Sequence, residues 1–143
     1  MNFLPLPIAS SGEGCEIMRI TALIVDDSSV MRKIIERALR QACLEVDTVY
    51  EASSGVEGLE VLKAQKVDII FSDINMPVMD GLDFVRQLRA QNLAVGVPVV
   101  MITTESSAEH VKQAIEAGAR GYIRKPFTPE QIKERVLPLL SVV

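Results

Sequence analysis

Three aspartates follow directly on apolar runs of this 143-residue sequence. Asp26 and Asp27 come after residues 20–25, and Asp73 comes after residues 67–72. If folding brings them together, each pair of carboxylates about 4 Å apart repels by roughly 4 kcal/mol at an effective dielectric constant near 20. A proton or a cation must then lie among them. A hard divalent ion with oxygen ligands fits best, and we predict Mg²⁺.

Two further polar residues occupy equivalent positions. Thr103 follows the apolar run 97–102, and Lys125 follows the short run 121–124. With Mg²⁺ bound, a carboxylate oxygen of Asp73 could attack phosphorus and form an aspartyl phosphate. Phosphoryl transfer depends mainly on positioning and charge neutralisation. Lys125 would supply a second cation to the phosphoryl oxygens, and the Thr103 hydroxyl would donate a hydrogen bond.

Four residues form the expected metal site. We expect Asp27 and Asp73 to bind the ion directly, Asp26 to bind it through water, and the backbone carbonyl of Asn75 to complete the shell. Taken singly, each acid also has a structural interpretation, as a helix cap or a turn residue. Their joint placement at successive strand ends favours the metal site.

Five apolar runs alternate with five segments of helical periodicity. The expected strands cover residues 20–25, 45–50, 67–72, 97–102 and 121–124, and the helix starts are marked by Ser28-Ser29, by a capping box at Ser54 and Glu57, by Asp80-Gly81, by a second capping box at Ser106 and Glu109, and by Thr128. This alternation predicts an α/β fold, a (βα)5 doubly wound parallel five-stranded sheet with right-handed crossovers. Such sheets bind ligands at the carboxyl ends of their strands. Only the second strand brings no polar group of suitable chemistry to that edge. Pro138 should kink or end the last helix.

The remaining composition indicates one soluble domain with a tail. Residues 1–18 contain Pro5 and Pro7 but no Lys or Arg, so we expect a flexible tail rather than a signal peptide, with Met18 as an alternative start. Residues 19–143 would form the domain. The net charge of −4 argues against nucleic acid as a partner. No apolar run reaches the roughly 20 residues of a membrane span, and the two cysteines have no metal spacing, so we expect a cytoplasmic protein.

Four segments resemble the signature segments of response-regulator receiver domains, especially the stand-alone type that regulates chemotaxis. They are residues 26–33 (DDSSVMRK), 73–81 (DINMPVMDG), 101–105 (MITTE) and 121–127 (GYIRKPF). The resemblance covers residues 19 to about 141. It implies a flavodoxin-like fold with strand order 2-1-3-4-5.

The resemblance also implies roles for individual residues. They are the phosphoacceptor Asp73, the acid pair Asp26 and Asp27, the switch hydroxyl of Thr103, the switch aromatic Tyr122, and Lys125 as phosphate contact, with a cis bond before Pro126. Three neighbours would modulate the lifetime of the phosphoryl group: Asn75, Glu105 and Thr104. Thr104 departs from the family pattern, in which a small residue such as alanine is usual.

The function implied is a signalling switch rather than a conventional enzyme. A histidine kinase would donate the phosphoryl group to a monomeric domain, which would signal by contact with a protein target through its fourth helix, fifth strand and fifth helix. Chemotaxis or motility is the first interpretation and a phosphorelay intermediate the second. A Mg²⁺-dependent aspartyl-phosphate phosphatase ranks below, because position 75 is Asn rather than a second acid. A flavodoxin-like nucleotide or flavin binder also ranks below, because two carboxylates follow the first strand and would repel phosphate.

Overall fold

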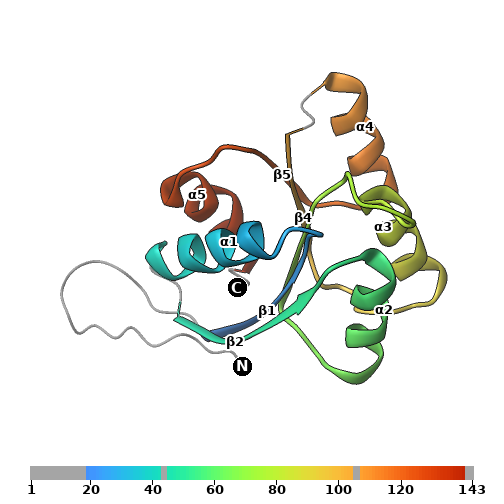
Figure 1. Ribbon diagram of the computed structural model, residues 1–143, viewed down its shortest axis with the longest axis horizontal. Helices are drawn as coiled ribbons and strands as arrows, with labels where there is room; N and C mark the ends of the chain where they lie inside the picture. Colours follow the sequence, from blue (N-terminus) through green and yellow to red (C-terminus); the bar gives the residue numbers. More distant parts are fainter. Residues whose placement is uncertain (1–18, 43–44, 105–106, 141–143) are drawn as a thin grey trace.

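A computed structural model describes residues 19–42, 45–104 and 107–140 of the chain (Figure 1). Strands and helices alternate along it. The strands are β1 (Arg19–Val25), β2 (Glu45–Ala52), β3 (Ile69–Ser72), β4 (Val99–Thr103) and β5 (Gly121–Arg124). The helices are α1 (Ser29–Gln41), α2 (Gly55–Ala64), α3 (Gly81–Ala90), α4 (Ala108–Ala117) and α5 (Pro129–Leu140).

The five strands form one parallel sheet in the order β2-β1-β3-β4-β5. Helices α1 and α5 cover one face, and α2, α3 and α4 cover the other (Figure 1). Two apolar clusters fill the spaces between sheet and helices, one on each face. The predicted doubly wound α/β fold and its strand order are confirmed.

The central strands are buried on both faces, as their continuous apolar runs predict. Every residue of β3 and β4 is buried. The β2 strand lies at the sheet edge and extends two residues beyond the predicted end, because its pairing with β1 continues to Val25 and Ala52. The β3 strand begins two residues later than predicted, at Ile69.

Hydroxyl side chains begin most of the helices. The Ser28 Oγ accepts from the Met31 N–H at 3.1 Å, and the Ser54 Oγ accepts from the Glu57 N–H at 3.1 Å. The predicted capping box of Ser54 and Glu57 is half formed, because the Glu57 carboxylate accepts from the Ser53 N–H, at 2.7 Å, instead of the Ser54 N–H. Thr128 and Gln131 form a reciprocal capping box, with bonds of 2.9 and 3.2 Å.

The predicted capping box of Ser106 and Glu109 is wrong. The cap of α4 is Ser107, whose Oγ accepts from the His110 N–H at 3.2 Å, and the helix starts at Ala108. A serine caps only the helix that begins at the next residue. Where two serines are adjacent, the sequence does not determine which of them is the cap. Ser106 itself lies outside the described residues.

Some large apolar side chains of the helices are exposed, namely Val30, Ile34, Val56 and Ile115. Helix α5 continues to Leu140, two residues past Pro138. No helix in the described ranges is long and apolar enough to cross a membrane.

Candidate functional site

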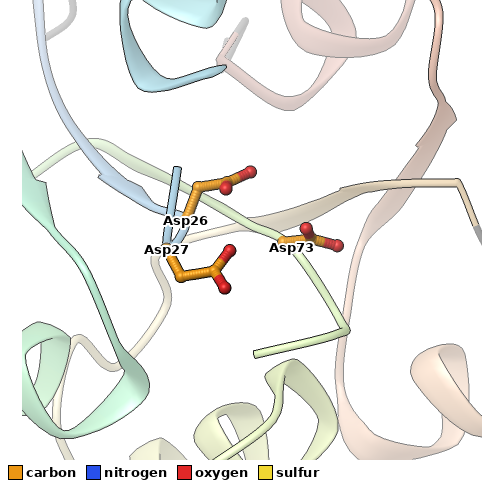
Figure 2. A group of neighbouring side chains, drawn as sticks. All are labelled: Asp26, Asp27 and Asp73. Carbon is orange, nitrogen blue, oxygen red and sulfur yellow. The ribbon is translucent and has the colours of Figure 1, made fainter. Parts of the chain in front are cut away.

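The register of the central strands brings the three aspartates together. Val25 of β1 pairs with Ser72 of β3, so the next residues, Asp26 and Asp73, leave the sheet side by side. The Asp73 N–H donates to the Val25 carbonyl at 3.0 Å. One carboxylate oxygen from each of Asp26, Asp27 and Asp73 lies within 4.8 Å of the others. Figure 2 shows the three side chains on the loops that follow β1 and β3.

Asp26 is the buried member of the group, with 1% of its surface exposed. Its Oδ1 accepts from the Ser28 N–H at 2.9 Å, and its Oδ2 accepts from the Lys125 ammonium at 3.0 Å. Burial raises the pKa of the Asp26 carboxyl above its ordinary value, although the Ser28 N–H and Lys125 both stabilise the charged form. Additional positive charge beside Asp26 would therefore stabilise its charged form.

Asp73 is oriented by its own loop. Its Oδ1 accepts from the N–H groups of Ile74 at 2.7 Å and Asn75 at 3.3 Å, and its Oδ2 accepts from the Lys125 ammonium at 3.1 Å. The loop lies against the first residue of α3: the Gly81 N–H donates to the Ile74 carbonyl at 2.8 Å. A Cβ at position 81 would overlap the Asp73 carbonyl oxygen, so this close approach requires glycine.

Lys125 joins Asp26 and Asp73 across the sheet. Its peptide bond to Pro126 is cis, as the family resemblance implies. The Lys125 N–H donates to the Thr103 carbonyl at 2.9 Å, and this bond holds Lys125 beside the last residue of β4. Its side chain is 12% exposed, and its ammonium contacts both Asp26 and Asp73.

The donor set fits a divalent cation. With its carboxylates ionised, the cluster of three acids and one ammonium carries a net charge of −2, which one Mg²⁺ would balance. Asp27 is exposed, and no hydrogen bond or ion pair of its carboxylate is found within the described residues. Carboxylate oxygens with access to water are the ligands that Mg²⁺ prefers. Asp26, Asp27 and Asp73 could therefore hold the ion.

The other predicted site residues lie around this cluster. Thr103 is fully buried at the end of β4, and Thr104 beside it is exposed. Asn75 is exposed on the Asp73 loop. Tyr122 is half-buried in β5 and packs against the apolar cluster of the α2-α3-α4 face. Glu105 lies outside the described residues.

Sequence reasoning missed the contribution of the second strand. Glu51 of β2 accepts from Arg32 Nε at 2.8 Å, and Arg32 Nη1 donates to the backbone carbonyl of Asp26 at 2.6 Å. The second strand therefore reaches the site through an arginine of α1. The only sequence signal is a charged residue, Glu51, directly after the predicted edge strand 45–50.

Comparison with known proteins agrees with this geometry. Residues 22–137 match the family described as response regulator receiver domain. The chain belongs to the response-regulator receiver family. Members of this family are signalling proteins of two-component systems rather than conventional enzymes.

Several relatives of this receiver domain are chemotaxis proteins. It is 45% identical over 120 residues to the chemotaxis protein CheY1 of Helicobacter pylori, a match that covers 83% of this chain and 95% of that one. It is 43% identical to a CheY homolog of Campylobacter jejuni, covering 83% and 91% of the two chains. Among solved structures, the chemotaxis protein CheY4 of Vibrio cholerae is similar, with a TM-score of 0.73, 38% identity, and coverage of 84% and 98%.

Proposed function

We propose that this receiver domain is a phosphorylation-activated switch that accepts a phosphoryl group on Asp73 from a histidine kinase and signals by protein contact. The observation that carries the proposal is the convergence of Asp26, Asp27 and Asp73 within 4.8 Å, with Lys125 bridging two of them.

The reaction would proceed by attack of an Asp73 carboxylate oxygen on the phosphorus of a phosphohistidine. A P–O bond to Asp73 forms while the P–N bond to the kinase histidine breaks, and the imidazole leaves and takes up a proton. The N–H groups of Ile74 and Asn75 hold one oxygen of the Asp73 carboxylate, so the side chain has a defined orientation before attack. Such pre-positioning is the main protein contribution to phosphoryl transfer.

Charge neutralisation would be shared by the chain and the metal. Asp27 and Asp73 would bind Mg²⁺ directly, Asp26 would bind it through water, and the Asn75 carbonyl would add a fourth protein ligand. The bound ion would neutralise phosphoryl charge. The Lys125 ammonium, 3.1 Å from Asp73 Oδ2, would balance negative charge on the phosphoryl oxygens. The Thr103 hydroxyl at the end of β4 would donate a hydrogen bond to another phosphoryl oxygen.

The output would be protein contact on the face made by α4, β5 and α5. Phosphorylation would draw Thr103 toward the phosphoryl group and let the half-buried Tyr122 turn inward, which would change that face. Ile115 on α4 and Arg124 on β5 are exposed, and they would be available for apolar and charged contacts with a partner. The similarity to chemotaxis proteins of three bacteria supports chemotaxis or motility as the process.

Intact mass spectrometry tests the proposal. The protein is incubated with Mg²⁺ and either acetyl phosphate or a phosphorylated histidine kinase. One phosphoryl group should be added to the wild type and none to Asp73→Asn. The adduct should also be lost on treatment with hydroxylamine, which cleaves acyl phosphates.

Asp80→Asn is the matched control, because Asp80 follows in the same loop but caps α3 through the Asp83 N–H at 2.8 Å. It should still be phosphorylated. An unchanged wild-type mass with both donors, in a folded protein that binds Mg²⁺, would refute Asp73 as an acceptor.

A further inference from the structure

The Asp26 backbone is held at both of its polar groups by contacts that involve the edge strand β2. Its N–H donates to the Ala52 carbonyl at 3.0 Å. Its carbonyl accepts from Arg32 Nη1 at 2.6 Å, and Arg32 Nε donates to the Glu51 carboxylate at 2.8 Å. A single guanidinium thus joins α1, β2 and the loop after β1.

The geometry of α1 and the low exposure of the side chain hold Arg32 in this position. Its own N–H donates to the Ser28 carbonyl at 3.0 Å in the first turns of α1. Helical side chains lean toward the N-terminus of their helix, which directs the guanidinium back to Asp26. The side chain is only 15% exposed, so the two hydrogen bonds are shielded from water.

The bond to the Asp26 carbonyl has a consequence for Asp27. The Asp26 carbonyl and the Asp27 N–H belong to one rigid peptide plane, so holding the carbonyl limits rotation of the plane that carries the Asp27 Cα. The Asp27 carboxylate has no hydrogen bond or ion pair within the described residues. Its direction toward Asp26 and Asp73 therefore depends on its backbone (Figure 2).

We propose that Arg32 is a positioning residue that directs the Asp27 carboxylate into the metal site through the Asp26–Asp27 peptide plane. The inference rests on the proposed function, since it assumes that the three acids bind Mg²⁺. It adds a residue that touches neither the metal nor the phosphoryl group, and it assigns Glu51 the task of holding the guanidinium.

Removal of Arg32 should change the Kd for Mg²⁺ in opposite directions through its charge and through its positioning role. Arg32 is a cation near three carboxylates, so its removal by itself would make Mg²⁺ bind more tightly. Loss of positioning would make Mg²⁺ bind more weakly, and partners that orient metal ligands typically contribute about 10-fold or more to metal affinity. The sign of the change in Kd therefore separates the two effects.

Lys33 provides a matched control. Its ammonium also pairs with Glu51, at 3.0 Å, but its side chain is 67% exposed and no contact joins it to Asp26 in the described part of the chain. Arg32→Met and Lys33→Met each remove one positive charge and one partner of Glu51, at adjacent positions. Only Arg32→Met removes the bond to the Asp26 carbonyl.

The experiment measures Mg²⁺ affinity of the full chain by isothermal titration calorimetry at 0.15 M salt. Arg32→Met should raise Kd about 10-fold, whereas Lys33→Met should leave it within about twofold of the wild type. In the metal-free proteins, the ¹⁵N-edited NMR spectrum should show the Asp27 amide signal displaced in Arg32→Met and not in Lys33→Met.

Each outcome decides between the claims. An Arg32→Met protein that binds Mg²⁺ as tightly as Lys33→Met, or more tightly, overturns the positioning role while the proposed function stands. A folded wild type that binds no Mg²⁺ overturns both. If Arg32→Met does not fold, Arg32→Lys decides, because it keeps the charge but lacks the two-armed donor: Kd should rise about threefold or more, and an unchanged Kd refutes the role.

Discussion

Repulsion among Asp26, Asp27 and Asp73 predicts that Mg²⁺ reverses the relative stability of the wild type and the variant Asp27→Asn. The perturbation is Asp27→Asn, which removes one of three like charges but keeps the shape of the side chain. Because the Asp27 carboxylate has no hydrogen bond or ion pair among the described residues, its neutralisation breaks no bond there. Without metal, Asp27→Asn should be more stable than the wild type.

The magnitude follows from the geometry of the cluster. At 4.8 Å, a carboxylate pair repels by about 1 kcal/mol with the screening of water and about 3 kcal/mol at an effective dielectric constant near 20. Asp27 takes part in two such pairs, and attraction to the Lys125 ammonium offsets part of their repulsion. Asp27 is exposed, so screening is close to that of water. We expect Asp27→Asn to raise the free energy of unfolding by about 1 kcal/mol in EDTA.

Magnesium should reverse this order. A ligand present at 100 times its Kd stabilises the folded state by about 2.7 kcal/mol. The wild type should gain this amount, whereas Asp27→Asn should gain little because it lacks a metal ligand. The variant should then be the less stable protein by more than about 1 kcal/mol. Urea denaturation followed by circular dichroism, in EDTA and in excess Mg²⁺, measures both differences.

Asp47→Asn is the control, since Asp47 is an exposed acid on β2 outside the cluster. It should change neither stability nor the Mg²⁺ effect. The reasoning fails if Asp27→Asn is less stable than the wild type in EDTA, or if Mg²⁺ stabilises both proteins equally.

Three further perturbations test the framework of the site. Val78 is 94% exposed at a φ of 71° in a γ-turn closed by a bond of 2.7 Å between the Met79 N–H and the Pro77 carbonyl. A β-branched residue is strained there, so Val78→Asn should raise the urea-derived free energy of unfolding by about 1 kcal/mol, and a decrease would contradict the strain. Gly81→Ala should lower the free energy of unfolding by about 2 kcal/mol, because the added Cβ meets the Asp73 carbonyl oxygen. It should also weaken Mg²⁺ binding in calorimetry. A urea denaturation curve equal to that of the wild type would refute the clash. Hydrogen bonds from Arg32 and Lys33 lower the pKa of Glu51, so its charge stabilises the fold at neutral pH and this contribution is lost as pH falls through the lowered folded-state value. Glu51→Gln should be less stable than the wild type at pH 7, and the two proteins should become equally stable once the pH is below the lowered folded-state pKa of Glu51; a pH-independent difference in urea titrations would exclude this linkage.

Much of the fold was predictable because it depends on local patterns. The apolar runs before Asp26 and Asp73 identify buried strands, and Ser28, Ser54 and Thr128 mark helix starts through short-range hydrogen bonds. The prediction failed where two adjacent residues can serve equally well. Ser106 and Ser107 are both good caps by residue type, and the structure uses Ser107.

The candidate site was predictable for a related reason. In a parallel sheet all strand ends lie at one edge, so a polar residue that ends an apolar run is placed there by topology alone. Asp26, Asp73 and Lys125 were identified in this way, and their contacts at 3.0 and 3.1 Å agree with the expectation.

The sequence by itself determined which residues end each strand, and therefore which chemistry gathers at the edge of the sheet. Only the tertiary structure decided how those residues are held: the pairing of Val25 with Ser72, the close approach of Gly81 to Asp73, and the bond from Arg32 to the Asp26 carbonyl. The physical reason is the distance along the chain between the residues that interact. Strand ends and caps follow from neighbours within a few residues, whereas the link from Glu51 through Arg32 depends on strand register and helix packing across 19 residues of chain.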